Sequence, residues 1–195
     1  MTVVDDRTEM ADTDNERTLD AMFAALEQGP FLDGYKIDIV GGAVHMTPQR
    51  SNHWDIIFGL LEQLRSKYER RRLLSDVRID YPGALNAFCS DVALVAEGAE
   101  RTKQGGFLCK DVEFVAEVIS RSTGENDYGP QKTGYATAEV GVYLVVDPYQ
   151  GKCHVYTQPK LGDYRVETKV DFGEEIDLTH TFLDLTIDTS DFSRD

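Results

Sequence analysis

The sequence predicts an α/β or α+β fold, with helices on both faces of a central sheet. The first observation is that Ser90–Ala96, Val112–Ile119 and Gly141–Asp147 are almost continuously apolar, as strands are when both faces of their sheet are covered. The second is the order of elements after residue 50: a helix, three strands, a short helix and a fourth strand. With 195 residues, the chain is long enough for one domain with a sizeable core.

The acidic N-terminal segment, residues 1–16, has few apolar side chains and is expected to be disordered. A first helix fits residues 17–28, where apolar residues recur at helical spacing and Gly29 provides a stop. The domain itself is expected to span residues 17–188, and residues 189–195 form a short acidic tail.

A β-hairpin is predicted where Tyr35–Val40 and Ala43–Thr47 flank the pair Gly41-Gly42, because two glycines suit a tight turn between strands. Side chains alternate along a strand, so Lys36, Asp38 and Val40 are expected on one face of the first strand. Two charged side chains therefore share a face of this hairpin.

The longest helix is predicted from about Asn52 to Arg71. Its apolar residues at helical spacing are assigned to the core: Trp54, Ile57, Phe58, Leu61, Leu64 and Tyr68. The end of this helix is basic, since residues 65–78 hold six bases and two acids. The preferred interpretation is a solvated helix C-terminus, where cations suit the helix dipole, and the alternative is a phosphate-contacting patch. The sequence leaves both open.

The remaining elements are predicted from apolar runs separated by turn residues. They are strands at 73–80, 90–96 and 112–119, a helix at 130–139, a strand at 141–147, an antiparallel pair at 152–158 and 164–170, and an edge strand near 182–185.

The net charge of −15 argues against a polyanionic partner until its location is considered. Residues 1–20 carry −5 and residues 171–195 carry −7, so the central residues 21–170 carry only −3. No apolar run approaches the roughly 20 residues of a membrane helix, and the N-terminus lacks the features of a signal peptide. A cytoplasmic protein with three reduced cysteines is therefore expected.

The residue most in need of an explanation is Glu117, which lies inside the apolar run Val-Ala-Glu-Val-Ile. Asp91 begins the preceding apolar strand, and if the two strands are antiparallel neighbours, both carboxylates face one corner of the sheet. Two close carboxylates repel each other unless a cation lies between them, and a divalent ion with oxygen ligands fits that place. A buried salt bridge between Glu117 and Lys132 or a nearby arginine is the alternative.

Lys132, on the short helix after the strand, is expected to reach the same corner. A lysine beside two metal-bound carboxylates can orient a water molecule or stabilise an oxyanion, as phosphodiester hydrolysis requires. The pattern thus indicates phosphate chemistry, although the residues alone leave a structural ion pair equally open.

Four stretches of the sequence carry a resemblance to a known family. They are YKIDIVGGAVHMTP with Asn52-His53 after it, SDVALV, the long run FVAEVISRSTGENDYGPQKTGYATAEVGVYLVVDP, and the terminal pieces CHVYTQP and GDYRV. The chain resembles the Uma2 family of the PD-(D/E)XK nuclease superfamily over roughly residues 30–180. The resemblance implies a restriction-endonuclease-like core, a central mixed sheet flanked by helices, with an N-terminal hairpin and C-terminal antiparallel strands.

The resemblance also implies roles for particular residues. Asp91 and Glu117 match the two acids that hold the metal, and Asp38 matches an auxiliary acid of the hairpin. In the family pattern a lysine stands four residues after an aspartate and a tyrosine eight after it. From Asp127 the tyrosine is in register, but position 131 is Gln131 and the lysine comes one residue later, at Lys132.

The function that follows from the resemblance is a Mg²⁺-dependent endonuclease that hydrolyses DNA, with Mn²⁺ able to substitute. Asp91 and Glu117 bind the metal, Lys132 positions the water and Asp38 assists. One alternative is a catalytically impaired binding or interaction module that keeps the nuclease fold, which the glutamine at 131 favours. Another is a metal-dependent hydrolase of a different phosphate substrate. A homodimer is expected by analogy and because strand edges need covering.

Overall fold

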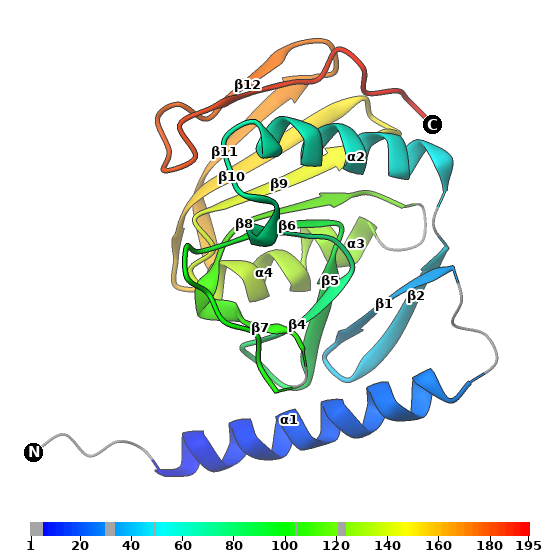
Figure 1. Cartoon of the computed structure of the whole chain (residues 1–195), viewed down its shortest axis with the longest axis vertical. Helices are drawn as coiled ribbons and strands as arrows, with labels where there is room; N and C mark the ends of the chain where they lie inside the picture. Colours follow the sequence, from blue (N-terminus) through cyan, green and yellow to red (C-terminus); the bar gives the residue numbers. More distant parts are fainter. Residues whose placement is uncertain (1–5, 30–33, 49, 104, 121–123) are drawn as a thin grey trace, which may run out of the picture.

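The computed structural model describes residues 6–29, 34–48, 50–103, 105–120 and 124–195 (Figure 1). Helix α1 (Asp6–Glu27) begins well before Arg17, so the segment predicted to be disordered is helical from Asp6 onwards. Residues 1–5, the remainder of that segment, lie outside the described residues. Within the described chain no helix is both long and apolar enough to cross a membrane.

The largest sheet has six strands and both parallel and antiparallel pairs, which confirms the predicted mixed α/β architecture. In spatial order it contains β11 (Asp163–Asp171), β10 (Lys152–Lys160), β9 (Val142–Asp147), β8 (Val112–Val118), β6 (Val92–Val95) and β3 (Leu73–Leu74). Only the β8–β9 pair is parallel, because the chain returns between these strands through α3 (Gly124–Tyr128) and α4 (Pro130–Thr137).

Helices cover both faces of this sheet (Figure 1). Because side chains alternate along β8, Phe114, Ala116 and Val118 pack in the cluster that includes α2 (Ser51–Arg65). Val115 and Ile119 belong to the opposite cluster, which includes residues of α4. Glu117 lies between those two on the same face, so its carboxylate points toward α4 and away from α2.

A second, five-stranded sheet carries the N-terminal hairpin. Its order is β2 (Ala43–Pro48), β1 (Tyr35–Val40), β5 (Asn86–Ser90), β4 (Val77–Tyr81) and β7 (Phe107–Leu108). β5 ends at Ser90 in this sheet and β6 begins at Val92 in the six-stranded sheet. Asp91 is therefore the residue at which the chain passes from one sheet to the other.

The remaining elements are short. Two 3-10 turns, Arg70–Arg72 and Cys109–Asp111, precede β3 and β8, and β12 (Glu175–Asp177) pairs with β13 (Thr186–Asp188) beyond the main sheet. The three cysteines are free thiols, as expected.

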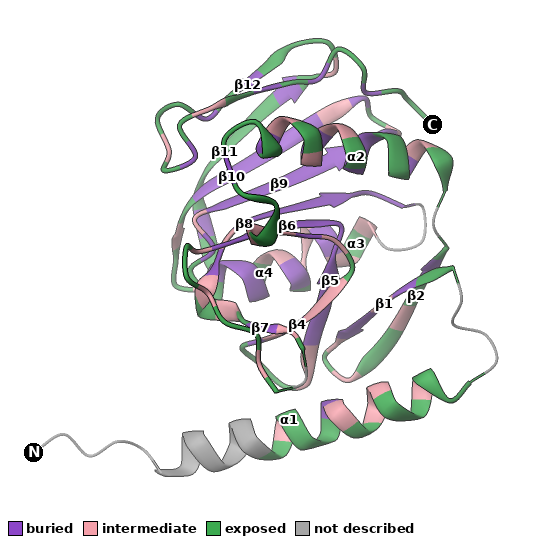
Figure 2. Ribbon diagram, in the orientation of Figure 1, coloured by how far each residue is buried: buried purple, intermediate pink, exposed green. Residues whose placement is uncertain are grey.

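The predicted core face of α2 is partly wrong. The buried residues are His53, Ile56, Ile57, Leu60 and Leu64. Trp54 and Phe58 are instead 50% and 47% exposed. The buried stripe has helical spacing too, but it is turned because His53 is drawn inward: its ring Nε2 donates a hydrogen bond to the carbonyl of Ile119 at 2.8 Å. In Figure 2, exposed (green) and buried (purple) residues both occur along α2.

The edge strand predicted near residues 182–185 is displaced, since the strand in this region, β13, begins only at Thr186. Leu183 is fully buried, but its neighbours form turns, with Asp184 at φ 43° and its amide bonded to the carbonyl of Thr181. The apolar character at this point reflects packing, because Leu183 belongs to the core cluster that includes α2.

Candidate active site

Five ionisable side chains meet, buried, at the junction of the two sheets. We call them the carboxylate centre: Lys36, Asp38, Asp91, Glu117 and Asp127. Strand pairing brings the two central acids together, since β6 and β8 are antiparallel with Val92 opposite Ala116. The backbone amide of Asp91 donates to Glu117 Oε2 at 3.2 Å, and the amide of Val118 donates to Asp91 Oδ2 at 2.7 Å. The two predicted metal-binding acids are thus hydrogen-bonded neighbours of one corner.

A lysine from the hairpin occupies the space between these carboxylates. The ammonium Nζ of Lys36 lies 2.7 Å from Glu117 Oε2 and 3.0 Å from Asp91 Oδ1. Asp38 Oδ2 is 3.9 Å from the same nitrogen. Charge-assisted hydrogen bonds of this length are the strong class, and here solvent cannot weaken them, because Lys36 is 9% and Glu117 0% exposed.

The hairpin is held in place by its turn and by pairing with β5. Gly41 and Gly42 adopt φ values of 57° and 79°, a conformation that glycine reaches without strain. Ile39 pairs with Ala87, and the amide of Cys89 donates to Asp38 Oδ1 at 2.7 Å. Alternation along β1 then points Lys36 and Asp38 into the same buried corner.

Helix α4 supplies the polar groups on the other side of Glu117. The hydroxyl of Tyr135 donates to Glu117 Oε1 at 2.6 Å, so the Ser90 hydroxyl, 3.0 Å away, donates to Tyr135. Gln131 is buried and hydrogen-bonds to Asp38 through its side chain. Gly134 allows α4 to pack closely against Phe88 of β5, because a Cβ at this position would lie 2.8 Å from the Phe88 ring.

The electrostatics of the centre follow from one cation facing four carboxyl groups. Burial raises the pKa of Glu117 well above its usual value, the nearby Lys36 lowers it, and repulsion from Asp91 and Asp127 raises it further. Burial likewise raises the pKa of Asp127 to about 8, and that of Asp38 above its ordinary range. Burial alone would lower the pKa of Lys36, but attraction to the surrounding acids raises it well above normal. Lys36 is therefore an ammonium at neutral pH.

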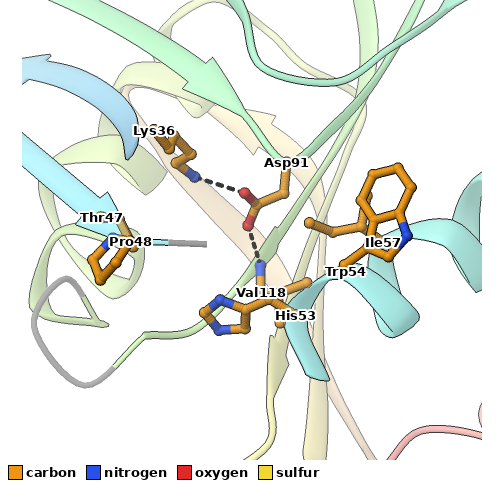
Figure 3. A pocket seen from close by; sticks show the side chains of 8 residues that line it. All are labelled: Lys36, Thr47, Pro48, His53, Trp54, Ile57, Asp91 and Val118. Carbon is orange, nitrogen blue, oxygen red and sulfur yellow. Dashed lines mark hydrogen bonds and ion pairs between the residues drawn. The ribbon is translucent and has the colours of Figure 1, made fainter. Parts of the chain in front are cut away.

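A small cavity connects the centre to the surface. It has a volume of about 10 Å³, room for about one water molecule. Its wall includes Lys36 and Asp91 of the centre together with Thr47, Pro48, His53 and Trp54 (Figure 3). Asp91 is the acid that this opening reaches, whereas Glu117 lies behind it.

The structure unites three of the four predicted site residues. Asp91, Glu117 and Asp38 meet at the corner, but Lys132 does not: its Nζ pairs with Asp163 Oδ1 at 2.9 Å and lies 4.9 Å from the Tyr156 ring centroid. Gln131 faces the centre, and a step of one residue turns the next side chain by about 100° around the helix. The expectation that Lys132 reaches the carboxylates is therefore not met.

Lys36 is the residue that sequence reasoning missed as a site residue. The only signal for it was its place on the same hairpin face as Asp38. That signal carries weight only once the hairpin is known to pack against the strands of Asp91 and Glu117, which the sequence does not state. Asp127 was noted as the start of a sequence pattern, without a role of its own.

The arrangement of acids, lysine and mixed sheet can now be compared with known proteins. The model of the Uma2 family, described as "Putative restriction endonuclease", matches residues 21–190. The chain belongs to the Uma2 family. No curated protein matches the sequence significantly.

Among solved structures, this Uma2 chain is similar to one from Anabaena variabilis described as "a putative nuclease belonging to DUF820". The TM-score is 0.63 at 12% identity, over 80% of this chain and 88% of the other. At that identity the likeness concerns the fold, and it confirms the nuclease-like architecture expected from the sequence.

A restriction-endonuclease-like family implies a divalent metal as cofactor. Among the described residues, no group of three or more carboxylate, thiol or imidazole side chains is arranged to bind a metal ion. At the corner itself, the ammonium of Lys36 lies between Asp91 and Glu117. These two acids offer carboxylate oxygens, the type of ligand that a hard divalent ion prefers. Asp91 and Glu117 are the residues that would hold a divalent ion.

Proposed function

We propose that this protein is a metal-dependent nuclease that hydrolyses DNA phosphodiester bonds, with Lys36 as the lysine of its active site. Asp91 and Glu117 bind the divalent ion, Mg²⁺ or in its place Mn²⁺, and Asp38 assists by holding Lys36. The observation that carries the proposal is the shared contact of one ammonium with both acids, at 3.0 and 2.7 Å. Membership of the Uma2 family supports the reaction class.

The chemistry assigns Lys36 a specific role. Hydrolysis forms a bond from a water oxygen to phosphorus while the bond from phosphorus to a sugar oxygen breaks, and negative charge builds on the phosphate oxygens. Because its pKa is raised, Lys36 keeps its proton and cannot act as the base. Its ammonium instead donates hydrogen bonds to the attacking water or to the charged phosphate oxygens. A bound divalent ion would supply further charge stabilisation and activate the water.

The supporting groups keep this lysine in position. The distance of 3.9 Å from Asp38 Oδ2 leaves Lys36 a carboxylate partner when Asp91 and Glu117 turn to another cation. The Tyr135 hydroxyl fixes Glu117 from behind, through Oε1, and so leaves Oε2 directed at the corner. The site thus has two acids, one lysine and positioning groups from β1 and α4.

A binding module that keeps the fold without catalysis is the second candidate. It is favoured by the orientation of Lys132, whose nitrogen pairs with Asp163, and by a cavity of about 10 Å³ that admits a water but no phosphate without movement. A hydrolase of another phosphate substrate differs from the first proposal only in what it cleaves. Homodimer formation and a cytoplasmic location remain predictions.

The test is a cleavage assay on DNA, RNA and a small phosphodiester, with Mg²⁺ or Mn²⁺. Four proteins are compared: the parent, Asp91→Ala/Glu117→Ala, Lys36→Met and Lys132→Met. The expected result is DNA cleavage by the parent and by Lys132→Met, and a loss of at least 100-fold in the other two. The two lysine variants are matched controls, because both remove an ammonium that is paired within 3.0 Å.

Three results contradict the proposal in different ways. No cleavage by the parent with either metal favours the binding module. Cleavage that survives Lys36→Met and is lost in Lys132→Met returns the catalytic role to the helix lysine. Preferred cleavage of the small phosphodiester identifies the other hydrolase.

A further inference from the structure

An exposed aromatic pair lies beside the mouth of the carboxylate centre. Trp54 and Phe58, one turn apart on α2, are 50% and 47% exposed, and their ring centroids are 6.0 Å apart at an interplanar angle of 35°. Single exposed apolar side chains are common, but a contiguous exposed apolar patch often marks a binding site. Neither ring is needed for the core, since the buried face of α2 consists of other residues.

The position of Trp54 connects this pair to the chemistry. Trp54 lines the same cavity as Asp91 and Lys36, and Figure 3 shows its ring on the opposite side of Asp91 from Thr47 and Pro48. The bond from His53 to the Ile119 carbonyl fixes the first turn of α2 against the end of β8. An aromatic face is thereby held at a set place next to the acids.

We infer that Trp54 stacks against an unpaired base of a single-stranded DNA substrate, next to the phosphate that faces Lys36. This inference rests on the proposed function for the identity of the substrate. Stacking on an aromatic ring accepts any base but requires that the base be free of its duplex neighbours. The preferred substrate is accordingly a single strand or an unpaired end, and a continuous duplex is a poor one.

The charge of the protein agrees with this choice. Duplex binding draws most of its affinity from many lysine and arginine contacts to phosphates. Residues 21–170 carry a net charge of −3, and the cavity wall contributes one ammonium beside an acid. Stacking contributes affinity without added positive charge, so it suits an acidic protein that must still hold a nucleic acid.

The composition provides a direct probe, because Trp54 is the one tryptophan of the sequence. The experiment titrates oligo(dT) of about 12 nucleotides into the full chain with a chelator present, while tryptophan fluorescence is recorded selectively. Binding of labelled single-stranded and duplex DNA is measured in parallel for the parent, Trp54→Ala and Trp54→Phe. Phe182→Ala is the matched control, since Phe182 is also 47% exposed but does not line the cavity.

The expected result is quenching of Trp54 on addition of oligo(dT), with weaker binding to duplex. Trp54→Ala should weaken single-strand binding roughly 10- to 100-fold, Trp54→Phe much less, and Phe182→Ala not measurably. Three outcomes overturn the inference: no quenching, duplex bound as tightly as single strand, or RNA bound more tightly than DNA. A dimer of the parent that Trp54→Ala converts to monomer also overturns it, because the aromatic pair then contacts a second copy.

These readouts separate the two proposals. Quenching and Trp54-dependent binding without cleavage of any substrate would contradict the nuclease proposal and support base stacking on Trp54. Cleavage that depends on Asp91 and Glu117 but is unchanged by Trp54→Ala would contradict base stacking on Trp54 and support the nuclease proposal.

Discussion

Replacing Lys36 by methionine tests whether the carboxylate centre depends on this one ammonium. Methionine keeps much of the volume and removes the charge that Asp91 and Glu117 share. Breaking a buried ion pair by removing one partner typically costs about 3–5 kcal/mol, because the remaining charges are left uncompensated. We expect a loss of that size in the free energy of unfolding at pH 8.

The magnitude follows from burial, as a comparison with the second lysine shows. Lys132 pairs with Asp163 at 2.9 Å, a distance similar to the two contacts of Lys36. The Asp163 side chain, however, is 68% exposed, whereas that of Glu117 is 1% exposed. Exposed pairs contribute about 0–1 kcal/mol, so Lys132→Met should cost less than about 1 kcal/mol. Two pairs of equal length should therefore differ several-fold in effect.

The cost of Lys36→Met should also depend on pH. The folded-state pKa values of Glu117 and Asp127 are raised above their unfolded values, so the folded protein binds more protons and its stability falls as pH rises through the folded values. Without Lys36 these values rise further, because the attraction that lowers them is gone. At pH 5 Glu117 and Asp127 of the variant are largely protonated and neutral, and the cost should be smaller than at pH 8.

The assay is urea unfolding followed by circular dichroism at pH 5 and pH 8, for the parent and both lysine variants. Equal losses for Lys36→Met and Lys132→Met would refute the reasoning. So would a cost of Lys36→Met that is the same at both pH values, because the centre would then not be governed by uncompensated charge.

Three further predictions concern the same centre. Adding Mn²⁺ should raise the melting temperature of Lys36→Met more than that of the parent, since a cation can then replace the lost ammonium. Equal increases in the two melting temperatures would argue against metal binding by Asp91 and Glu117. Asp127→Asn should stabilise the protein by on the order of 1–3 kcal/mol at pH 9 and by much less at pH 5, because the pKa of about 8 reflects the cost of ionising this buried acid. Urea unfolding at both pH values measures this gain. A gain that does not depend on pH would contradict the prediction. Tyr135→Phe should cost about 1–3 kcal/mol in urea unfolding, since Glu117 and Ser90 both lose a buried partner, and no loss would mean that water replaces the hydroxyl.

Much of the fold could be predicted because it is determined locally. The hairpin predicted from Gly41-Gly42 and its flanking strands is confirmed. The structure also meets the condition under which Asp91 and Glu117 were expected to share a corner, because their strands pair antiparallel. Apolar runs identified the central strands because such runs are stable only in a covered sheet. Periodicity failed for α2, where the stripe containing Trp54 and the stripe containing His53 have the same spacing. Only the neighbours of the helix decide which one is buried.

The sequence by itself determined the class of the fold, the family, and the acids Asp91 and Glu117, since a carboxyl group in a buried strand needs a partner. Only the tertiary structure decided which lysine is that partner. Lys132 is near Glu117 in sequence, but the turn of α4 directs it to Asp163. Lys36 is 81 residues from Glu117 and arrives because β1 pairs with β5 at the point where the chain crosses between sheets. A contact made by strand pairing over such a separation depends on register and packing, which no local pattern of residues encodes.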